Sequence, residues 1–125
     1  MIGPHEGKEL DLMLAGKKPL AAFGDIIPEN GIIAEEIIPE KAFAPYVEQG
    51  RILRFSQETP SIKESEVMRH VCFTLPDQEW RARTYLWLRE QSWSGNMPND
   101  THCDVIIGRL LGYDEESIQQ FIQQF

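Results

Sequence analysis

The stretch VMRHVCFTLPDQEWRARTYLWLREQ, residues 67–91, sets a strand directly before a helix. Its first nine residues alternate between two sets, and a period of two is that of an extended strand. Proline disfavours a continuing strand and suits the first turn of a helix, so Pro76 predicts the boundary between strand 67–75 and helix 77–91. One set contains Val67, Arg69, Val71, Phe73 and Leu75, and the other contains Met68, His70, Cys72 and Thr74.

The helix expected over 77–91 carries two apolar stripes where an ordinary surface helix has one. We therefore weigh three interpretations, which are core packing, a subunit interface and a small-molecule pocket. Three arginines beside the stripes could serve an anionic ligand or form a solvated flank with nearby acids. Trp80, Thr84, Trp87 and Leu88 form one stripe, Ala82, Tyr85 and Leu86 form the other, and the arginines are Arg81, Arg83 and Arg89.

The elements around this stretch are shorter. Strands and helices interleave without strict alternation, which predicts one α+β domain over residues 1–125, with a small, mainly antiparallel sheet covered by helices. We expect helices over Glu6–Ala15 and Ala44–Gln49, the second beginning at Pro45. Strands are expected over Leu20–Phe23, stopped by Gly24 and Asp25, and over Arg51–Ser56. Exposed loops are expected over Gln57–Glu64 and Ser92–Asn99.

A pair of helices is expected at the C-terminus, over residues 100–125. Asn99 or Asp100 can cap the first helix, Gly112 can close it, and Asp114 can cap the second. The spacing resembles a DNA-binding helix-turn-helix, but phosphate contacts need Lys or Arg and only Arg109 is basic here. We therefore expect a helical corner packed on the core, with no nucleic-acid partner.

Three isoleucine doublets occur within thirteen residues, at 26–27, 32–33 and 37–38. Two of them precede a proline, which favours an extended conformation for the residue before it. Neighbouring side chains of an extended chain face opposite ways, so each doublet should turn one isoleucine inward and one outward. The outward set would need cover from this chain or from a second subunit.

The composition bounds the classes of protein that remain. The formal net charge is −8, which disfavours binding to nucleic acid or to an anionic membrane. No signal peptide and no apolar run long enough to span a bilayer is visible, so we expect no membrane partner. The two cysteines give no disulfide framework, and the simplest setting is the reducing cytoplasm.

The motifs of catalysis and metal binding are weak. His70, Cys72, His102 and Cys103 are zinc-type ligands, but no CxxC or HxxxH spacing joins them. Pairing Cys103 with His70, or Cys72 with His102, would give a nucleophile and a base, yet no motif supports either pair. Glycine-rich phosphate loops are missing. We expect no metal and no cofactor, and the sequence leaves enzymatic activity open while favouring its absence.

Two segments carry a resemblance. ELDLMLAGKKPLA at 9–21 and IGRLLGY at 107–113 look like parts of small bacterial orphan proteins, of the kind carried on mobile elements such as integron cassettes. The resemblance implies a small bacterial protein that self-associates. It brings no active-site residues with it.

The leading hypothesis from the sequence is protein–protein association, as a homo-oligomer or with another protein partner. One alternative is a small-molecule-binding protein or hydrolase that uses the aromatic helix 77–91. Another is an acidic inhibitor of a nucleic-acid-binding protein. The candidate binding residues are His70, Trp80, Arg83, Tyr85, Leu86, Trp87 and Trp93.

Overall fold

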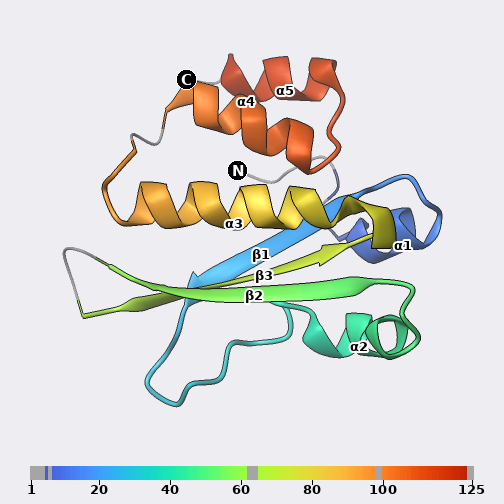
Figure 1. Ribbon diagram of the computed structural model, residues 1–125, viewed down its shortest axis with the longest axis horizontal. Coiled ribbons are helices and arrows are strands. Elements are labelled where there is room, and N and C mark those ends of the chain that lie inside the picture. Colours follow the sequence, from blue (N-terminus) through green and yellow to red (C-terminus); the bar gives the residue numbers. More distant parts are fainter. Residues whose placement is uncertain (1–4, 6, 62–64, 98–99, 124–125) are drawn as a thin grey trace.

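The computed structural model describes residues 5, 7–61, 65–97 and 100–123. Its centre is a three-stranded antiparallel sheet with the order β1-β3-β2, and helices lie on both faces of the sheet (Figure 1). This is the α+β fold with a C-terminal helix pair that the sequence predicts. The strands are β1 (Leu20–Ile26), β2 (Leu53–Pro60) and β3 (Val67–Thr74). The helices are α1 (Glu9–Leu14), α2 (Glu40–Glu48), the 3-10 turn η1 (Pro76–Gln78), α3 (Glu79–Trp93), α4 (Thr101–Leu110) and α5 (Glu115–Ile122).

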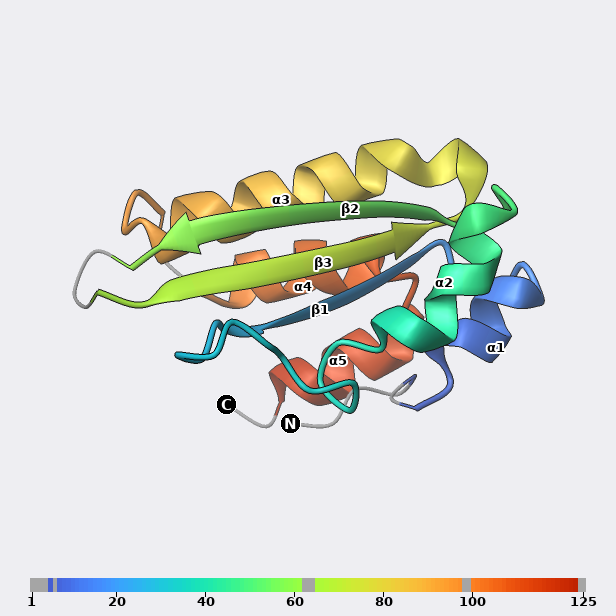
Figure 2. The same cartoon turned by 90° about the horizontal axis from the view of Figure 1, so that it is seen from below.

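Strand β3 lies between the other two strands (Figure 2). Its partners place Ala22 and Phe55 on either side of Cys72, and Phe23 and Ser56 on either side of Val71. Because β3 is central, every residue from His70 to Thr74 is buried. Cys72 belongs to one apolar cluster and Val71 and Phe73 belong to the other, so the alternation predicted for this strand is confirmed. The two faces of the sheet therefore support two separate apolar clusters.

The face toward α3 carries the first cluster. Helix α3 lies along the strands, and α4 and α5 lie on the same side of the sheet (Figure 1). Tyr85, Leu86 and Leu88 are each less than a tenth exposed there. The cluster consists of Leu20, Cys72, Ala82, Tyr85, Leu86, Leu88, Ile107 and Leu110.

The opposite face, toward α2, carries the second cluster. The rings of Phe43 in α2 and Phe73 in β3 stack with centroids 4.0 Å apart and planes 12° apart. Phe23 of β1 meets both rings edge-on. Such contacts stabilise aromatic pairs beyond their buried area. The cluster consists of Met13, Ala21, Ile38, Phe43, Ile52, Val71 and Phe73.

Both helices of the C-terminal pair begin at the caps that the sequence predicts, and the first is closed by the predicted glycine, while α5 ends at Ile122. The carboxylate of Asp100 accepts from the amides of His102 and Cys103, and that of Asp114 accepts from the amide of Ser117. Gly112 follows α4 with a φ of +83°. The alternative cap Asn99 lies outside the described residues, as does Phe125, the last residue of the expected helix pair.

Two buried or half-buried cations bind the carbonyl end of α4. The side chain of Lys18 is 1% exposed, and its Nζ donates to the carbonyl of Leu111 at 2.8 Å. Arg81 of α3 donates to the carbonyls of Arg109 and Leu110. Cations at this end also complement the helix macrodipole. These contacts attach the helix pair to the rest of the domain.

Two strand boundaries predicted from the sequence are wrong. Strand β1 continues through Gly24 and Asp25 to Ile26, because pairing with β3 supplies partners for the whole segment. Strand β2 begins at Leu53 and continues to Pro60, so the predicted loop at 57–64 is strand in its first half. Proline is compatible with β2 because β2 is an edge strand. Residues 62–64 of that loop lie outside the described part.

Three helix boundaries also differ from the expectation. Helix α2 begins at Glu40 and contains Pro45 in its interior. Both carboxylate oxygens of Glu35 accept from amides of its first turn, at Lys41 and Ala42, which is a cap that its sequence spacing does not suggest. Helix α1 begins at Glu9, with Glu6 outside the described residues, and α3 runs two residues beyond Gln91.

In two of the three isoleucine doublets one side chain turns outward and the other packs on the second cluster, as predicted for 32–33 and 37–38. In the third doublet Ile26 is exposed and Ile27 is half-buried without belonging to either cluster. Ile38 is 3% exposed and belongs to the second cluster, while its neighbour Ile37 is 42% exposed. Ile32 is the most exposed of the six, at 71%. The described residues contain no helix that is both long and apolar enough to cross a membrane.

We predict that Gly112→Ala lowers the free energy of unfolding by about 2 to 4 kcal/mol, measured by urea denaturation. A Cβ at this position would lie 2.5 Å from Cδ of Pro19 in a conformation that L-residues rarely adopt. Gly50→Ala is the matched control, because Gly50 has a φ of +73° with nothing within 4 Å of the added atom. The control should lose only about 1 to 2 kcal/mol. Equal losses would contradict the proposed contact with Pro19.

Candidate functional site: a pocket between the sheet and helix α3

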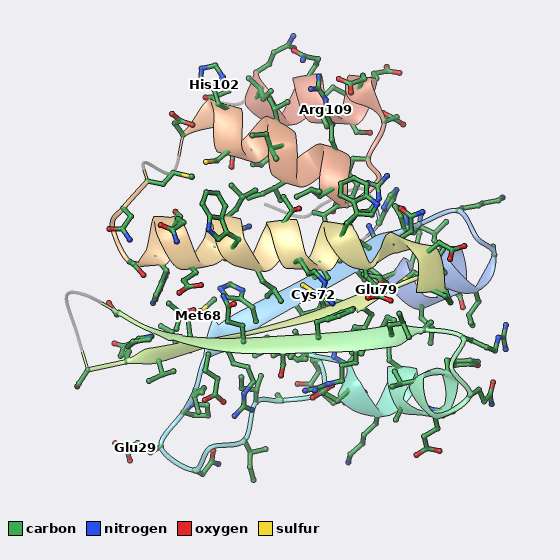
Figure 3. All side chains as sticks on the ribbon, viewed as in Figure 1. Glu29, Met68, Cys72, Glu79, His102 and Arg109 are labelled. Atoms are coloured by element: carbon green, nitrogen blue, oxygen red, sulfur yellow. The ribbon has the colours of Figure 1, made fainter. Side chains whose placement is uncertain are left out.

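A cavity of about 320 Å³ opens between the end of α3 and the first half of β3. Met68, which marks its sheet side, lies below α3 near the start of β3 (Figure 3). Strand β1 contributes a glycine, β3 contributes two residues and α3 contributes four. The lining residues are Gly24, Met68, His70, Tyr85, Arg89, Ser92 and Trp93.

Helical spacing explains why α3 presents four residues to this cavity. Tyr85, Arg89, Ser92 and Trp93 follow one another at i, i+4, i+7 and i+8, which places them on one face of a helix. The helix predicted from the sequence ends at Gln91, which separates Trp93 from this set. In the structure the helix includes Trp93, and the set is continuous.

His70 forms the floor of the cavity and is 5% exposed. Its ring meets the ring of Tyr85 edge-on, with centroids 6.2 Å apart. Its Nδ1 is buried and has no hydrogen-bond partner within the described part of the chain. Burial, together with the positive charge of Arg89, lowers the pKa of His70 to about 4, so the ring is neutral at neutral pH.

Gly24 makes room for this histidine. The two residues are paired across β1 and β3, and a Cβ at Gly24 would lie 2.7 Å from Nδ1 of His70. Any side chain at this position would therefore displace the imidazole or fill the cavity next to it. The glycine and the histidine form one local arrangement.

Arg89 and Trp93 form the opposite wall. The guanidinium of Arg89 lies 5.1 Å from the ring centroid of Tyr85, and its Nε donates to the phenol oxygen at 3.1 Å. Among the described residues, no carboxylate lies within ion-pair distance of Arg89. Nε1 of Trp93 is buried and, like Nδ1 of His70, lacks a partner in the described structure. Three nitrogen-bearing groups therefore surround one small space.

The structure brings together three of the seven candidate residues, namely His70, Tyr85 and Trp93. Leu86 lies in the first apolar cluster, and its carbonyl accepts from Nε2 of Gln57 at 2.9 Å. The other three lie on the outer face of α3. Arg89 is predicted only as a residue beside the aromatic stripes, although its i+4 spacing from Tyr85 is a signal that could assign it to the site.

The outer face of α3 consists of Trp80, Arg83, Thr84 and Trp87. Trp80 and Trp87 are 54% and 53% exposed, and Arg83 forms a 3.5 Å ion pair with Glu79. Leu88, which the sequence analysis groups with the tryptophans, is buried at 6% exposure, and that grouping is wrong. It is buried because α3 packs against both the sheet and α4, which widens the covered arc of the helix.

The proposed cysteine–histidine pairs gain no support from the structure. Burial raises the pKa of Cys72 to about 12, and α3 separates Cys72 from His102 (Figure 3). The Sγ of Cys103 contacts Sδ of Met97 at 3.6 Å. Residues 5, 7–61, 65–97 and 100–123 contain no group of three or more His, Cys, Asp or Glu side chains placed to hold a metal ion.

Comparison of the chain with protein-family models, with curated proteins and with solved structures finds no match. Two features of the described structure bear on function, namely the pocket and the outer face of α3. The pocket is the more specific of the two features, because two of its residues carry buried nitrogen atoms that lack hydrogen-bond partners in the described part of the chain.

We predict that His70 makes the fold sensitive to acid. The unfolded state binds a proton near pH 6.5 but the folded state binds it only near pH 4, so stability is complete above pH 6.5 and falls as the pH drops toward 4. The slope contributed by one such group is at most about 1.4 kcal/mol per pH unit. Urea denaturation of His70→Gln across this range should show a shallower dependence than the wild type.

His102→Gln is the control for this measurement, because His102 is an exposed histidine on α4. It should keep the wild-type dependence on pH. If His70→Gln has the same slope as the wild type, His70 is not responsible for the acid sensitivity.

Proposed function

We propose that this protein binds a small organic molecule in the pocket between β3 and α3. The observation that carries the proposal is that His70 and Trp93 both line one cavity, and that each has a buried nitrogen atom, Nδ1 and Nε1 respectively, without a hydrogen-bond partner among the described residues. A buried polar group without a hydrogen bond costs about 1–3 kcal/mol, so a ligand that supplies the missing partner gains affinity. Arg89 adds a charged donor at the same place.

The walls of the pocket support this proposal. Small-molecule sites are concave and combine apolar or aromatic walls with a few oriented polar groups. Tyr85 and Met68 supply the apolar walls, and the volume of about 320 Å³ is near the lower end for such sites. The expected ligand is therefore about the size of a single ring with substituents.

Binding is better supported than catalysis at this site. A nucleophile needs a base within hydrogen-bond distance, and none of the pocket residues forms such a pair among the contacts described above. Cys72, which is adjacent in the sheet, is fully buried and has a raised pKa. We assign the pocket a binding role without a reaction.

The indole N–H resonances of the three tryptophans provide a direct test. A panel of single-ring compounds, both charged and neutral, is titrated into ¹⁵N-labelled protein, and each indole signal is assigned with a Trp→Phe variant. A compound in the pocket should shift the Trp93 signal downfield, because its Nε1 gains an acceptor, and should leave Trp80 and Trp87 unchanged. If no compound moves the Trp93 signal, the proposed function is wrong.

A second candidate function is protein–protein association through the outer face of α3. Trp80 and Trp87 lie two turns apart and are each more than half exposed, and tryptophan is enriched at the centres of interfaces. The exposed isoleucines at 26, 32 and 37 lie in the segment on the other side of the sheet, so they would form a separate apolar surface (Figure 1). The partner is a second copy or another protein. A role as an acidic inhibitor of a nucleic-acid-binding protein rests on the net charge alone and stays a prediction.

If α3 mediates self-association, Trp80→Ser with Trp87→Ser should convert an oligomer to a monomer in sedimentation velocity over the micromolar range. The melting temperature of the monomer should change little, because both side chains are exposed. Arg83→Ser on the same face is the control for a change of polarity alone. A wild type that is monomeric throughout this range would contradict self-association.

We further propose that the protein acts in the cytoplasm. Neither Cys72 nor Cys103 forms a disulfide, and both side chains are buried. Cysteines held as thiols fit a reducing compartment.

A further inference from the structure

We infer that the ligand of the pocket is a small monocarboxylate with a planar apolar body. This inference rests on the proposed function, because it assigns a ligand class to the same pocket. Three features of the pocket carry it, namely the unpaired charge of Arg89, the donor character of Trp93 and the aromatic walls.

The first feature is the unpaired charge of Arg89. The chain contains 20 acidic and 12 basic residues, so an acidic partner is available to most arginines. Arg54, Arg69, Arg83 and Arg109 each pair with a glutamate. Among the described residues Arg51, Arg81 and Arg89 have no such pair. Arg51 is exposed and Arg81 donates to two backbone carbonyls, whereas Arg89 lies half-buried over an aromatic ring and bonds to a phenol through Nε alone. An arginine held without an acid in an acidic protein is suited to an anion from outside the chain.

The second feature is the hydrogen-bonding character of the surrounding groups. The indole Nε1 of Trp93 can only donate, and the guanidinium has several N–H donors and no acceptor. Both groups therefore require acceptor atoms on the ligand. A carboxylate presents two acceptor oxygens in a plane, and a guanidinium binds this arrangement with two parallel hydrogen bonds.

The charge of the pocket distinguishes a carboxylate from a phosphate. Arg89 is the one cationic side chain among the lining residues, and His70 is neutral at neutral pH. A doubly charged phosphate would leave part of its charge uncompensated in a partly desolvated site, which is unfavourable. A singly charged carboxylate matches the single guanidinium.

The third feature is the shape of the remaining walls. The ring of Tyr85 and the thioether side chain of Met68 leave an apolar space beside the polar groups. Flat apolar groups make favourable contacts with aromatic rings and with methionine sulfur. The ligand body that fits is a single planar ring attached to the carboxylate.

Matched pairs of an acid and its primary amide test the inference. Benzoate with benzamide, and nicotinate with nicotinamide, are titrated into the wild-type protein, with the Trp93 indole signal and calorimetry as readouts. Each pair keeps the ring and the planar head group and differs in charge. The acid should bind about tenfold to a hundredfold more tightly than its amide, as expected for a charge-assisted hydrogen bond.

Arg89→Gln should remove this preference, so that acid and amide bind with similar, weak affinity. Arg89→Lys should keep part of it, because it retains the charge without the planar fork. Arg83→Gln is the matched control, since Arg83 lies on the opposite, exposed face of the same helix, and it should keep the wild-type preference. Thermal denaturation of each variant checks that the fold is retained.

The outcomes separate the inference from the proposed function. If amides bind in the pocket as tightly as acids, the ligand class is wrong while the binding role stands. If the acids bind more tightly than the amides but the Arg89→Gln variant keeps this difference in affinity, Arg89 is not the anion-binding group and the inference is overturned. If neither member of any pair, nor any compound of the wider panel, shifts the Trp93 signal, both proposals fail.

Discussion

The fold depends on covering both faces of one central strand. Strand β3 is hydrogen-bonded on both edges, and its second half is buried on both faces, so it cannot be exposed to water on either side without loss of apolar burial. A separate apolar cluster covers each face of β3. Helices α3 and α4 form the cluster on one face, and α2 with the isoleucine segment forms the cluster on the other. The remaining elements are placed by these two layers.

The same constraint is relaxed at the start of β3. There the chain places Met68 and His70 on the α3 face, where Cys72 and Thr74 occupy the equivalent positions further along the strand. Gly24 leaves a gap on the neighbouring strand, and the last turns of α3 supply Arg89 and Trp93 in place of leucines. A cavity with polar groups thus lies at the end of a layer that is otherwise apolar. Polar residues stand at this end of the layer where apolar residues would pack more favourably. Natural proteins commonly accept such a cost at a functional site.

The sequence predicts the elements whose signals are local and redundant. Strand β3 has clean alternation followed by proline, and the C-terminal pair has caps and a closing glycine, so both were predicted correctly. The strand predicted over Arg51–Ser56 ends before β2 does. Gln57, Glu58 and Pro60 have low strand propensity, and only pairing with β3 overrides that preference. The helix predicted over Ala44–Gln49 begins later than α2, which starts at Glu40. The first turn of α2 is capped by Glu35, five residues before the helix begins, and this spacing is not a familiar cap signal.

The candidate site was predicted in part for a similar reason. His70, Tyr85 and Trp93 are each predicted as candidates on their own. That they line one pocket depends on the packing of α3 against β3, and no local sequence pattern predicts that packing. The small residue Gly24, whose role is to leave space, carries no sequence signal of its own. Trp80 and Trp87 have the same helical periodicity as core residues, and only the arrangement of the neighbouring layers decides that they face outward.

The proline at the end of β2 has a consequence for how the chain behaves when concentrated. Backbone amides alternate along an edge strand, and the amide of Ser61 points toward β3, so the nitrogen of Pro60 points away from the sheet, where it has no hydrogen to offer. Arg54 and Glu58 place charged groups along the same strand. A strand from another molecule that paired with this edge would lack one backbone hydrogen bond at Pro60 and would have to desolvate the charged side chains. Both costs disfavour edge-to-edge aggregation.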